Sequence, residues 1–304
     1  VPILLKADKA GGATHADFPA LIASAMPAHF WSKVRPDGMD CVLTQADGVT
    51  PLYREVATFD VGGTVIELHV GLPSYSHLAD TLVYLYYKNP DALVANSPLV
   101  WDSSFAAVYH MNDKPGDATM ILDSTANANH GTKGAGAAAP TEVAGTVGRA
   151  QQFVAASSQY ISLGNPASLK VQELTIMALA KSDILAATAY ISWLELEGAD
   201  RKQWELAASA PGRPGLYAMS GNGTEYAVAL LTPAEQAHPV DEWDVHAATF
   251  KRNAMCYVYR NGTVMRNDAS LDKDIAYAVS PIGQLRIGSR QRINALYHTG
   301  PICE

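Results

Sequence analysis

The chain reads Trp243-Asp-Val-His-Ala-Ala-Thr-Phe250 and then Met255-Cys-Tyr-Val-Tyr-Arg-Asn-Gly-Thr-Val-Met265 in the stretch that decides its fold class. Apolar and polar residues alternate along both runs, which is the period of a β-strand with one buried face. Asn261-Gly262 tolerates the positive φ angles of a type I′ turn, so the second run predicts a hairpin. The next apolar run, Leu285-Arg-Ile-Gly-Ser-Arg290, predicts a third strand. This order predicts an all-β fold of antiparallel β-sandwiches.

Composition limits the classes of protein to which the chain can belong. Its 304 residues are enough for two ordinary domains. Apolar residues make up 48% and charged residues 17%, without an apolar run of the roughly 18 residues that cross a bilayer. The net charge of −8 leaves no broad basic surface for phosphates. We therefore expect a globular chain that neither inserts into membranes nor binds nucleic acid.

The three cysteines are Cys41, Cys256 and Cys303, and none lies in a C-x-x-C pattern. The reading that the sequence favours is three reduced, buried thiols. A bridge between Cys256 and Cys303 is the alternative, and it would leave one thiol over. Val1 is followed directly by Pro-Ile-Leu-Leu, so no signal peptide is visible.

The first hundred residues consist of short alternating runs separated by turns, which favours antiparallel β-structure. Ile66–Val70 alternates and predicts one buried and one wet face. Thr81–Tyr87 is apolar on both faces and predicts a central strand. Phe18–Phe30 contains Pro19 and Pro27, which disfavour a long helix, so we expect mainly strand there.

Three segments of this first part resemble an uncharacterised β-sandwich domain that precedes laminin-G-like domains in bacterial surface and bacteriophage proteins. They are Asp40–Gly48, Pro51–Glu55 and Tyr84–Pro90, with Lys88 where that domain usually has glycine. The resemblance implies a domain over residues 1–95 and a biological context, but no active site. Residues 96–104 are expected to be a linker.

The rest of the chain, residues 105–304, resembles a laminin-G-like, concanavalin A-like jelly roll. The resemblance to its opening strands rests on Val108–Asp113, Leu122–Thr132, Gly148–Phe153 and Tyr160–Gly164. Leu174–Ala180, Tyr190–Leu196 and Gln203–Ala207 are expected as middle strands, and Thr232–Glu235 as a helical turn. Gly300–Glu304 resembles the start of the family's last strand, so a truncated domain with an unpaired sheet edge is expected.

The resemblance also implies a Ca²⁺ site, because family members hold Ca²⁺ near the loop over residues 123–131 and Ca²⁺ takes oxygen ligands. The matching positions are Asp113, Asp123, Asn129 and Glu304. Cys303 stands where the family has an aspartate. The alternative for Asp123 and the loop asparagines is a turn held by their own side-chain hydrogen bonds.

Glycan binding by the jelly roll would need an aromatic platform with polar groups beside it. The candidate platform residues are Trp193, Trp204, Tyr217 and Tyr226. Aromatic side chains in alternating strands also pack in cores, so each of these has that second reading.

Catalysis has one candidate pattern, because glucanases share the jelly-roll fold and use paired carboxylates. Glu195 and Glu197 lie two apart, but Gly198, Ala199 and Asp200 follow instead of a third alternating acid. The patterns of serine hydrolases, zinc proteases and P-loops are absent from the sequence.

Together these observations predict a non-catalytic binding or structural protein, displayed on a bacteriophage virion or secreted by a bacterium as an adhesion component. The location would be the virion surface or the cell exterior. The partners would be a cell-surface glycan, other virion or surface proteins, or further copies of the chain. A polysaccharide-active glycoside hydrolase is the alternative function.

Overall fold

The structure is a computed structural model in which contacts divide the chain into two units. The first unit comprises residues 1–108 and 124–126, and the second comprises residues 109–123 and 127–304. The described residues are 1–23, 25–89, 91, 94–183, 188–194, 202–209, 213–219, 226–230, 240–269, 275, 277, 284–289 and 297–304. At some positions within these strands the structure describes the backbone and not the side chain. These positions are 188, 189, 191–194, 202, 203, 208, 209, 213–219, 226–230, 268 and 269.

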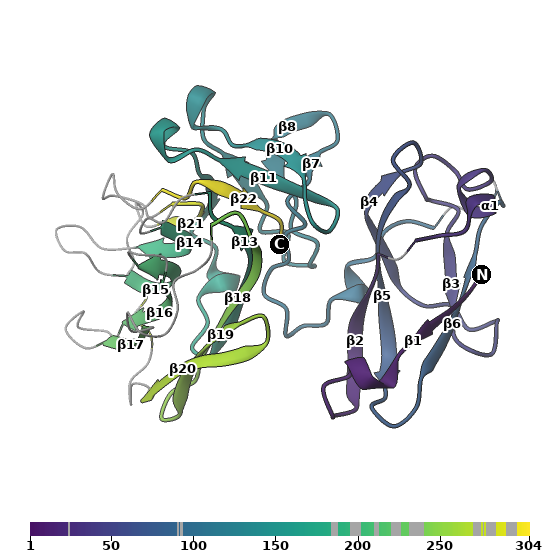
Figure 1. The fold of residues 1–304 in the computed structure, drawn as a ribbon, viewed down its shortest axis with the longest axis horizontal. Coiled ribbons are helices and arrows are strands. Elements are labelled where there is room, and N and C mark those ends of the chain that lie inside the picture. The colour runs from purple at the N-terminus through teal and green to yellow at the C-terminus, as the bar shows by residue number, and fades with distance from the viewer. Residues whose placement is uncertain are drawn as a thin grey trace. The chain divides into compact units, whose positions relative to one another are not determined.

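The first unit is a sandwich of two antiparallel sheets, each of three strands, in the orders β1-β6-β3 and β2-β5-β4 (Figure 1). Its strands are β1 (Pro2–Leu5), β2 (His15–Ile22), β3 (Val42–Thr44), β4 (Arg54–Asp60), β5 (Val65–Tyr75) and β6 (Thr81–Tyr86). Its helices are η1 (Ala7–Lys9), α1 (Ala28–Trp31) and η2 (Pro98–Val100). β6 lies between β1 and β3, so the prediction of a central strand is confirmed.

The core of this unit lies between the two sheets. Leu68 and Val70 of β5 and Leu43 and Leu85 of the other sheet are fully buried, together with Phe30 of α1. The region over residues 18–30 is strand only as far as Ile22, because Pro27 supplies the extended residue from which α1 begins. The expectation of mainly strand there was therefore only partly right.

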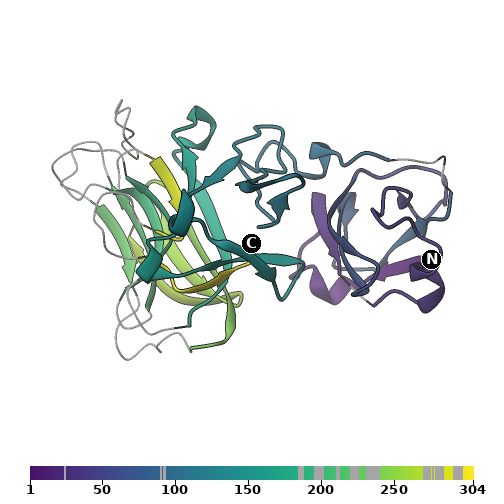
Figure 2. The same ribbon diagram turned by 90° about the horizontal axis from the view of Figure 1, so that it is seen from above.

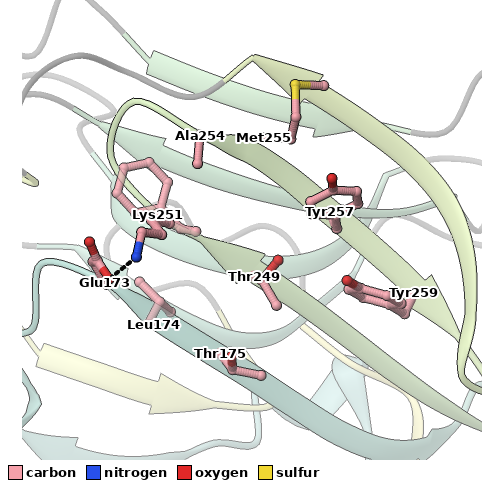
Figure 3. A pocket seen from close by; sticks show the side chains of 10 residues that line it. Glu173, Leu174, Thr175, Thr249, Lys251, Ala254, Met255, Tyr257 and Tyr259 are labelled. Atoms are coloured by element: carbon pink, nitrogen blue, oxygen red, sulfur yellow. Dashed lines mark ion pairs between the residues drawn. The ribbon is translucent and has the colours of Figure 1, made fainter. Parts of the chain in front are cut away.

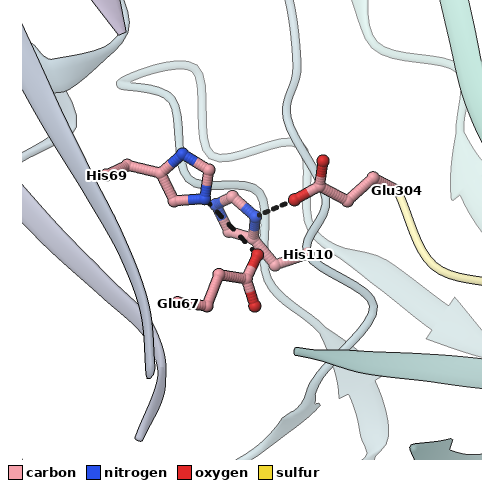
Figure 4. Close-up of side chains that lie close together, drawn as sticks. All are labelled: Glu67, His69, His110 and Glu304. Carbon is pink, nitrogen blue, oxygen red and sulfur yellow. Dashed lines mark hydrogen bonds and ion pairs between the residues drawn. The ribbon is translucent and has the colours of Figure 1, made fainter. Parts of the chain in front are cut away.

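The side of β5 that was expected to face water carries specific contacts instead. Glu67 Oε2 accepts a hydrogen bond of 2.9 Å from Thr58 Oγ1, and Nε2 of His69 lies 3.4 Å from Glu67 Oε1 (Figure 4). The ring of His69 lies 5.1 Å from that of Trp101. The prediction of a wet face was wrong because alternation reports only which side chains are polar.

Residues beyond position 93 are tied to the first unit by Arg54, which is only 1% exposed. Its Nε donates to Cys41 O at 3.0 Å and its Nη1 to Asn96 Oδ1 at 2.8 Å, and Nη2 donates to Val94 O. Asn96 also accepts from Val56 N at 2.9 Å. The start of the predicted linker thus lies against β4.

The second unit is a larger antiparallel sandwich, with one sheet of seven strands and one of nine (Figures 1 and 2). The seven-stranded sheet has the order β10 (Thr141–Ala144), β11 (Arg149–Phe153), β22 (Gly300–Ile302), β13 (Leu174–Lys181), β18 (Trp243–Phe250), β19 (Met255–Arg260), β20 (Thr263–Ala269). The other has the order β17 (Tyr226–Leu230), β16 (Arg213–Met219), β15 (Lys202–Ser209), β14 (Thr188–Leu194), β21 (Gln284–Ile287), β12 (Ile161–Gly164), β9 (Gly131–Lys133), β8 (Asp117–Ile121), β7 (Asp113–Lys114). Short helices η3 (Gly136–Ala138), η4 (Ala155–Ser157) and η5 (Ala167–Leu169) connect some of these strands. The all-β fold class is confirmed.

The core of the second unit forms between the inner faces of these sheets. Ala178, Ala248 and Val258 of the seven-stranded sheet are fully buried. The ring of His246 in β18 stacks on that of Tyr190 in β14, with centroids 4.8 Å apart. β18 therefore packs its even-numbered side chains inward, which leaves its odd-numbered side chains on the outer face.

The predicted hairpin is confirmed, since β19 and β20 pair through a turn at Asn261 and Gly262. These residues have φ angles of +49° and +77°, as a type I′ turn requires. The third predicted strand is β21, which pairs with β12 and β14 in the other sheet.

One segment differs from expectation, and another forms the strand that its resemblance implied. Residues 108–112, expected as a strand, are irregular, and Met111 has φ +55° with its carbonyl accepting from Gln151 Nε2 at 2.8 Å. The last residues form β22 between β11 and β13, and Leu179 N donates to Glu304 O at 2.6 Å. Gly300–Glu304 thus pairs on both sides within the sheet.

Candidate functional site

The candidate site is a groove of about 500 Å³ on the outer face of the seven-stranded sheet, where β13, β18 and β19 lie side by side (Figure 3). The side chains that shape it are Glu173, Thr175, Thr249, Lys251, Tyr257 and Tyr259. Glu173 and Thr175 precede the other four by more than 70 positions in the chain, and the pairing of the three strands brings them together.

One side of the groove is formed by two tyrosine rings. Tyr257 and Tyr259 occupy alternate positions of β19, so both point outward while Cys256 and Val258 are buried. The ring centroids lie 6.0 Å apart with an interplanar angle of 34°. Each ring offers an apolar face and a phenolic hydroxyl, which suits a ligand with both apolar and polar surface.

The floor and the opposite side of the groove are polar. Thr175 and Thr249 are directly paired across β13 and β18, and Thr249 is paired on its other side with Tyr257. Lys251 Nζ lies 3.4 Å from Glu173 Oε2, and these side chains are 65% and 55% exposed. Such an exposed ion pair contributes little to stability, so both charged groups can turn to a ligand.

The four aromatic residues predicted from the sequence lie elsewhere, on the nine-stranded sheet. Trp204 of β15 is 6% exposed, and its Nε1 donates to Tyr277 Oη at 3.1 Å. Trp193 pairs in register with Trp204, and Tyr217 and Tyr226 lie on β16 and β17. The side chains of these last three lie outside the described residues, so their role stays a prediction.

The residues predicted to bind Ca²⁺ are engaged by protein groups. Asp113 Oδ1 accepts from Lys133 Nζ at 2.5 Å and from Gln151 Nε2 at 2.8 Å. Glu304 Oε1 lies 3.1 Å from Nδ1 of His110 (Figure 4). The Lys133 ammonium thus already neutralises one carboxylate of the proposed set.

The loop over residues 123–131 is held by hydrogen bonds of its own side chains. Asp123 Oδ2 accepts from Asn129 N at 2.8 Å, and Asn129 Oδ1 accepts from Ser168 Oγ at 3.0 Å. Tyr109 Oη donates to Asn129 O at 2.6 Å. Burial, and then the nearby Asp123 carboxylate, raise the pKa of Tyr109, so this phenol stays protonated and remains a donor. A cation at this loop stays a prediction.

The tyrosine pair was not predicted, although its signal is present in the sequence. Met255-Cys-Tyr-Val-Tyr-Arg260 alternates, which places the two tyrosines on one face and Cys256 with Val258 on the other. Both faces are apolar or aromatic, so alternation could not say which one faces out. Glu195 and Glu197, the candidate catalytic pair, lie outside the described residues.

No protein-family model matches this sequence, and the comparison with curated proteins gives no match. Among solved structures, the chain is similar to the binding domain of Paraclostridial Mosquitocidal Protein 1, with a TM-score of 0.44 and 13% identity over 65% of this chain and 48% of that one. It is also similar to the botulinum neurotoxin serotype G binding domain, with a TM-score of 0.47 and 12% identity over 64% and 45%. A heptameric SAP-like pentraxin from Limulus polyphemus gives a TM-score of 0.33 and 16% identity over 44% and 62%.

The chain thus spans less than two thirds of each of these proteins, and two of the three are named as binding domains. In the part of the chain that the structure describes, no helix is long and apolar enough to cross a membrane. The sandwich assignment rests on the sheets themselves.

Proposed function

We propose that this chain is a non-catalytic, surface-displayed binding protein whose second unit binds a glycan in the groove between the two tyrosines and the Glu173–Lys251 pair. The observation that carries the proposal is the pair of adjacent rings on the outer sheet face, 6.0 Å apart, next to exposed hydroxyl and charged groups. Sugar rings have an apolar face that stacks on aromatic rings and a rim of hydroxyls that hydrogen-bond to polar groups.

We further propose a virion component or a secreted adhesin as its setting, with other surface proteins or copies of the chain as additional partners. The resemblance of residues 1–95 to bacteriophage and bacterial surface domains supports this setting. All three cysteines are buried thiols, which favours assembly in a reducing cytoplasm before release. A structural Ca²⁺ ion at the loop over residues 123–131 belongs to the same proposal.

The test is a glycan array with the purified chain, read with Ca²⁺ and again with chelator. We expect saturable binding that Tyr257→Ala and Tyr259→Ala each weaken at least about tenfold, which corresponds to about 1.4 kcal/mol of lost binding energy. Tyr53→Ala is the matched control, because this tyrosine is 56% exposed and belongs to the first unit.

Each other result has a clear meaning. Binding that survives both tyrosine substitutions would place the site outside the groove. Binding that is lost in chelator and in Asp123→Ala, but kept in the tyrosine variants, would place the site at the loop. Absence of binding to any glycan would leave a structural subunit as the function.

A further inference from the structure

We propose that the groove is one end of a longer binding track along the outer face of β18, which takes the interior of a linear polysaccharide rather than a single terminal sugar. This inference rests on the proposed function and names the class of glycan. It follows from three features of the outer face, which are its continuity, its profile and the chemistry of its two ends.

The outer face of β18 is continuous from the groove to the start of the strand. Trp243, Val245, Ala247 and Thr249 alternate with buried residues, and all four are half-buried. At about 3.4 Å per residue, the six steps from Trp243 to Thr249 cover about 20 Å. A surface of this length can contact several sugar residues in a row.

The profile of this face is a shallow trough. Ala247 is paired with Met177 of β13 on one side and with Tyr259 of β19 on the other. Met177 is 53% exposed, so a large side chain stands on each side of a small one. At Thr249 the raised side is Tyr257 of β19, whereas Thr175 of β13 is no larger than Thr249, so the trough opens toward β13 at the groove.

The two ends of the track have the same chemistry. At the groove, tyrosine rings lie across from the Lys251–Glu173 ion pair. At the far end, Trp243 is paired in register with Lys181, whose Nζ lies 3.5 Å from Asp241 Oδ1 and 3.8 Å from Asp183 Oδ1. Each end of the strand thus combines an aromatic side chain with a lysine–carboxylate pair.

A terminal sugar would be expected in an enclosed pocket that buries most of its surface. Here the polar and aromatic groups are spread along an open sheet face, and only the small side chain of Ala247 lies between the groove and Val245. A chain that passes through in either direction fits this arrangement better than a chain end does.

The test compares ligand lengths. Soluble β-1,3-glucan, xylan, mannan and dextran are screened by affinity electrophoresis, and a disaccharide and a hexasaccharide of each retained polymer are titrated by calorimetry. We expect the hexasaccharide to bind at least about tenfold more tightly than the disaccharide, a difference of about 1.4 kcal/mol. Trp243→Ala and Ala247→Gln should remove this gain, so that the hexasaccharide binds no more tightly than the disaccharide.

Trp243→Tyr is the rescue variant, because it keeps a stacking ring, and Tyr53→Ala is the neutral control. Ala247→Gln places its longer side chain on the outer face, so it keeps the proposal testable if Trp243→Ala fails to fold. Equal affinities for both ligand lengths would overturn the track and leave glycan binding standing. A gain in affinity that persists in both Trp243→Ala and Ala247→Gln would have the same meaning. No binding to any of the four polymers or their oligosaccharides would overturn the track, and with a negative array it would overturn the proposed function as well.

Discussion

Asn261 shows how much a single turn residue contributes beyond its backbone angle. Its Oδ1 accepts from Val245 N at 2.9 Å and its Nδ2 donates to Asp244 Oδ1 at 2.5 Å. Asp244 also accepts from Arg260 Nε at 2.9 Å. The sequence predicts the turn from the Asn-Gly pair alone, whereas the side-chain bonds tie the hairpin to β18.

The three cysteines are also a residue-scale feature, since all are buried thiols. Burial, and then the nearby Asp40 carboxylate, raise the pKa of the Cys41 thiol from 9.0 to about 12. The folded state therefore holds this proton more tightly than the unfolded state does. The protonated Cys41 thiol therefore makes its full contribution to the free energy of unfolding below pH 9, and this contribution is lost as the pH rises toward 12.

We therefore predict that iodoacetamide labels none of the thiols of the native chain at pH 9, because each is inaccessible and Cys41 is protonated. After unfolding without reductant, all three should be labelled, as counted by mass spectrometry. Ala156→Cys, at an exposed position of η4, is the positive control for native labelling. A single labelled site after unfolding would indicate a disulfide and contradict the structure.

At the scale of elements, the end of β21 depends on a glycine. Gly288 has φ +80°, and a Cβ added there would lie 2.3 Å from a ring carbon of Phe153, which is fully buried. Gly116 also has φ +80°, but nothing lies within 4 Å of an added Cβ. The two glycines thus share a backbone conformation and differ in packing.

We predict that Gly116→Ala costs about 1 kcal/mol of unfolding free energy, which is the cost of a left-handed alanine. Gly288→Ala should cost about 3 kcal/mol or more, because overpacking of the core adds to that backbone cost. Urea unfolding of both variants measures the difference. Equal losses would mean that the Phe153 ring moves aside at no cost.

Alternation predicted strands well where one face is apolar and the other polar, as in β18. The strand that the jelly-roll resemblance implied at residues 108–112 is absent, because Met111 turns into a left-handed conformation and its carbonyl accepts from the Gln151 side chain. That contact joins residues 40 positions apart, so no local pattern reports it.

At the scale of the whole molecule, Arg54 holds Val94 and Asn96 against the first unit. The sequence places a boundary at residue 95, whereas Arg54 donates to the carbonyls of Cys41 and Val94 and to the side chain of Asn96. The first unit extends to Val108 and takes in residues 124–126, where Ser124 Oγ donates to Glu55 Oε1 at 2.6 Å.

We predict that Arg54→Lys lowers the unfolding free energy of the chain by about 2–3 kcal/mol. A lysine keeps the charge, but it lacks the planar guanidinium group whose nitrogens donate to several acceptors at once. Arg35→Lys is the matched control, since Arg35 pairs with Asp37 at the exposed surface and such pairs contribute less than about 1 kcal/mol. Guanidinium unfolding of both variants is the measurement. Equal losses would show that the buried hydrogen bonds of Arg54 are not needed.

The sequence by itself determined the all-β class, most strand positions and the Asn261-Gly262 turn, because these depend on residues a few positions apart. Only the tertiary structure decided which face of each strand points outward and where the candidate site lies. It also decided that β21 joins the nine-stranded sheet and β22 the seven-stranded sheet. Glu173, Thr249 and Tyr257 meet because β13, β18 and β19 pair in one register. That register is fixed by burial of the opposite face against the other sheet, and burial of this kind belongs to the folded molecule and not to any segment of it.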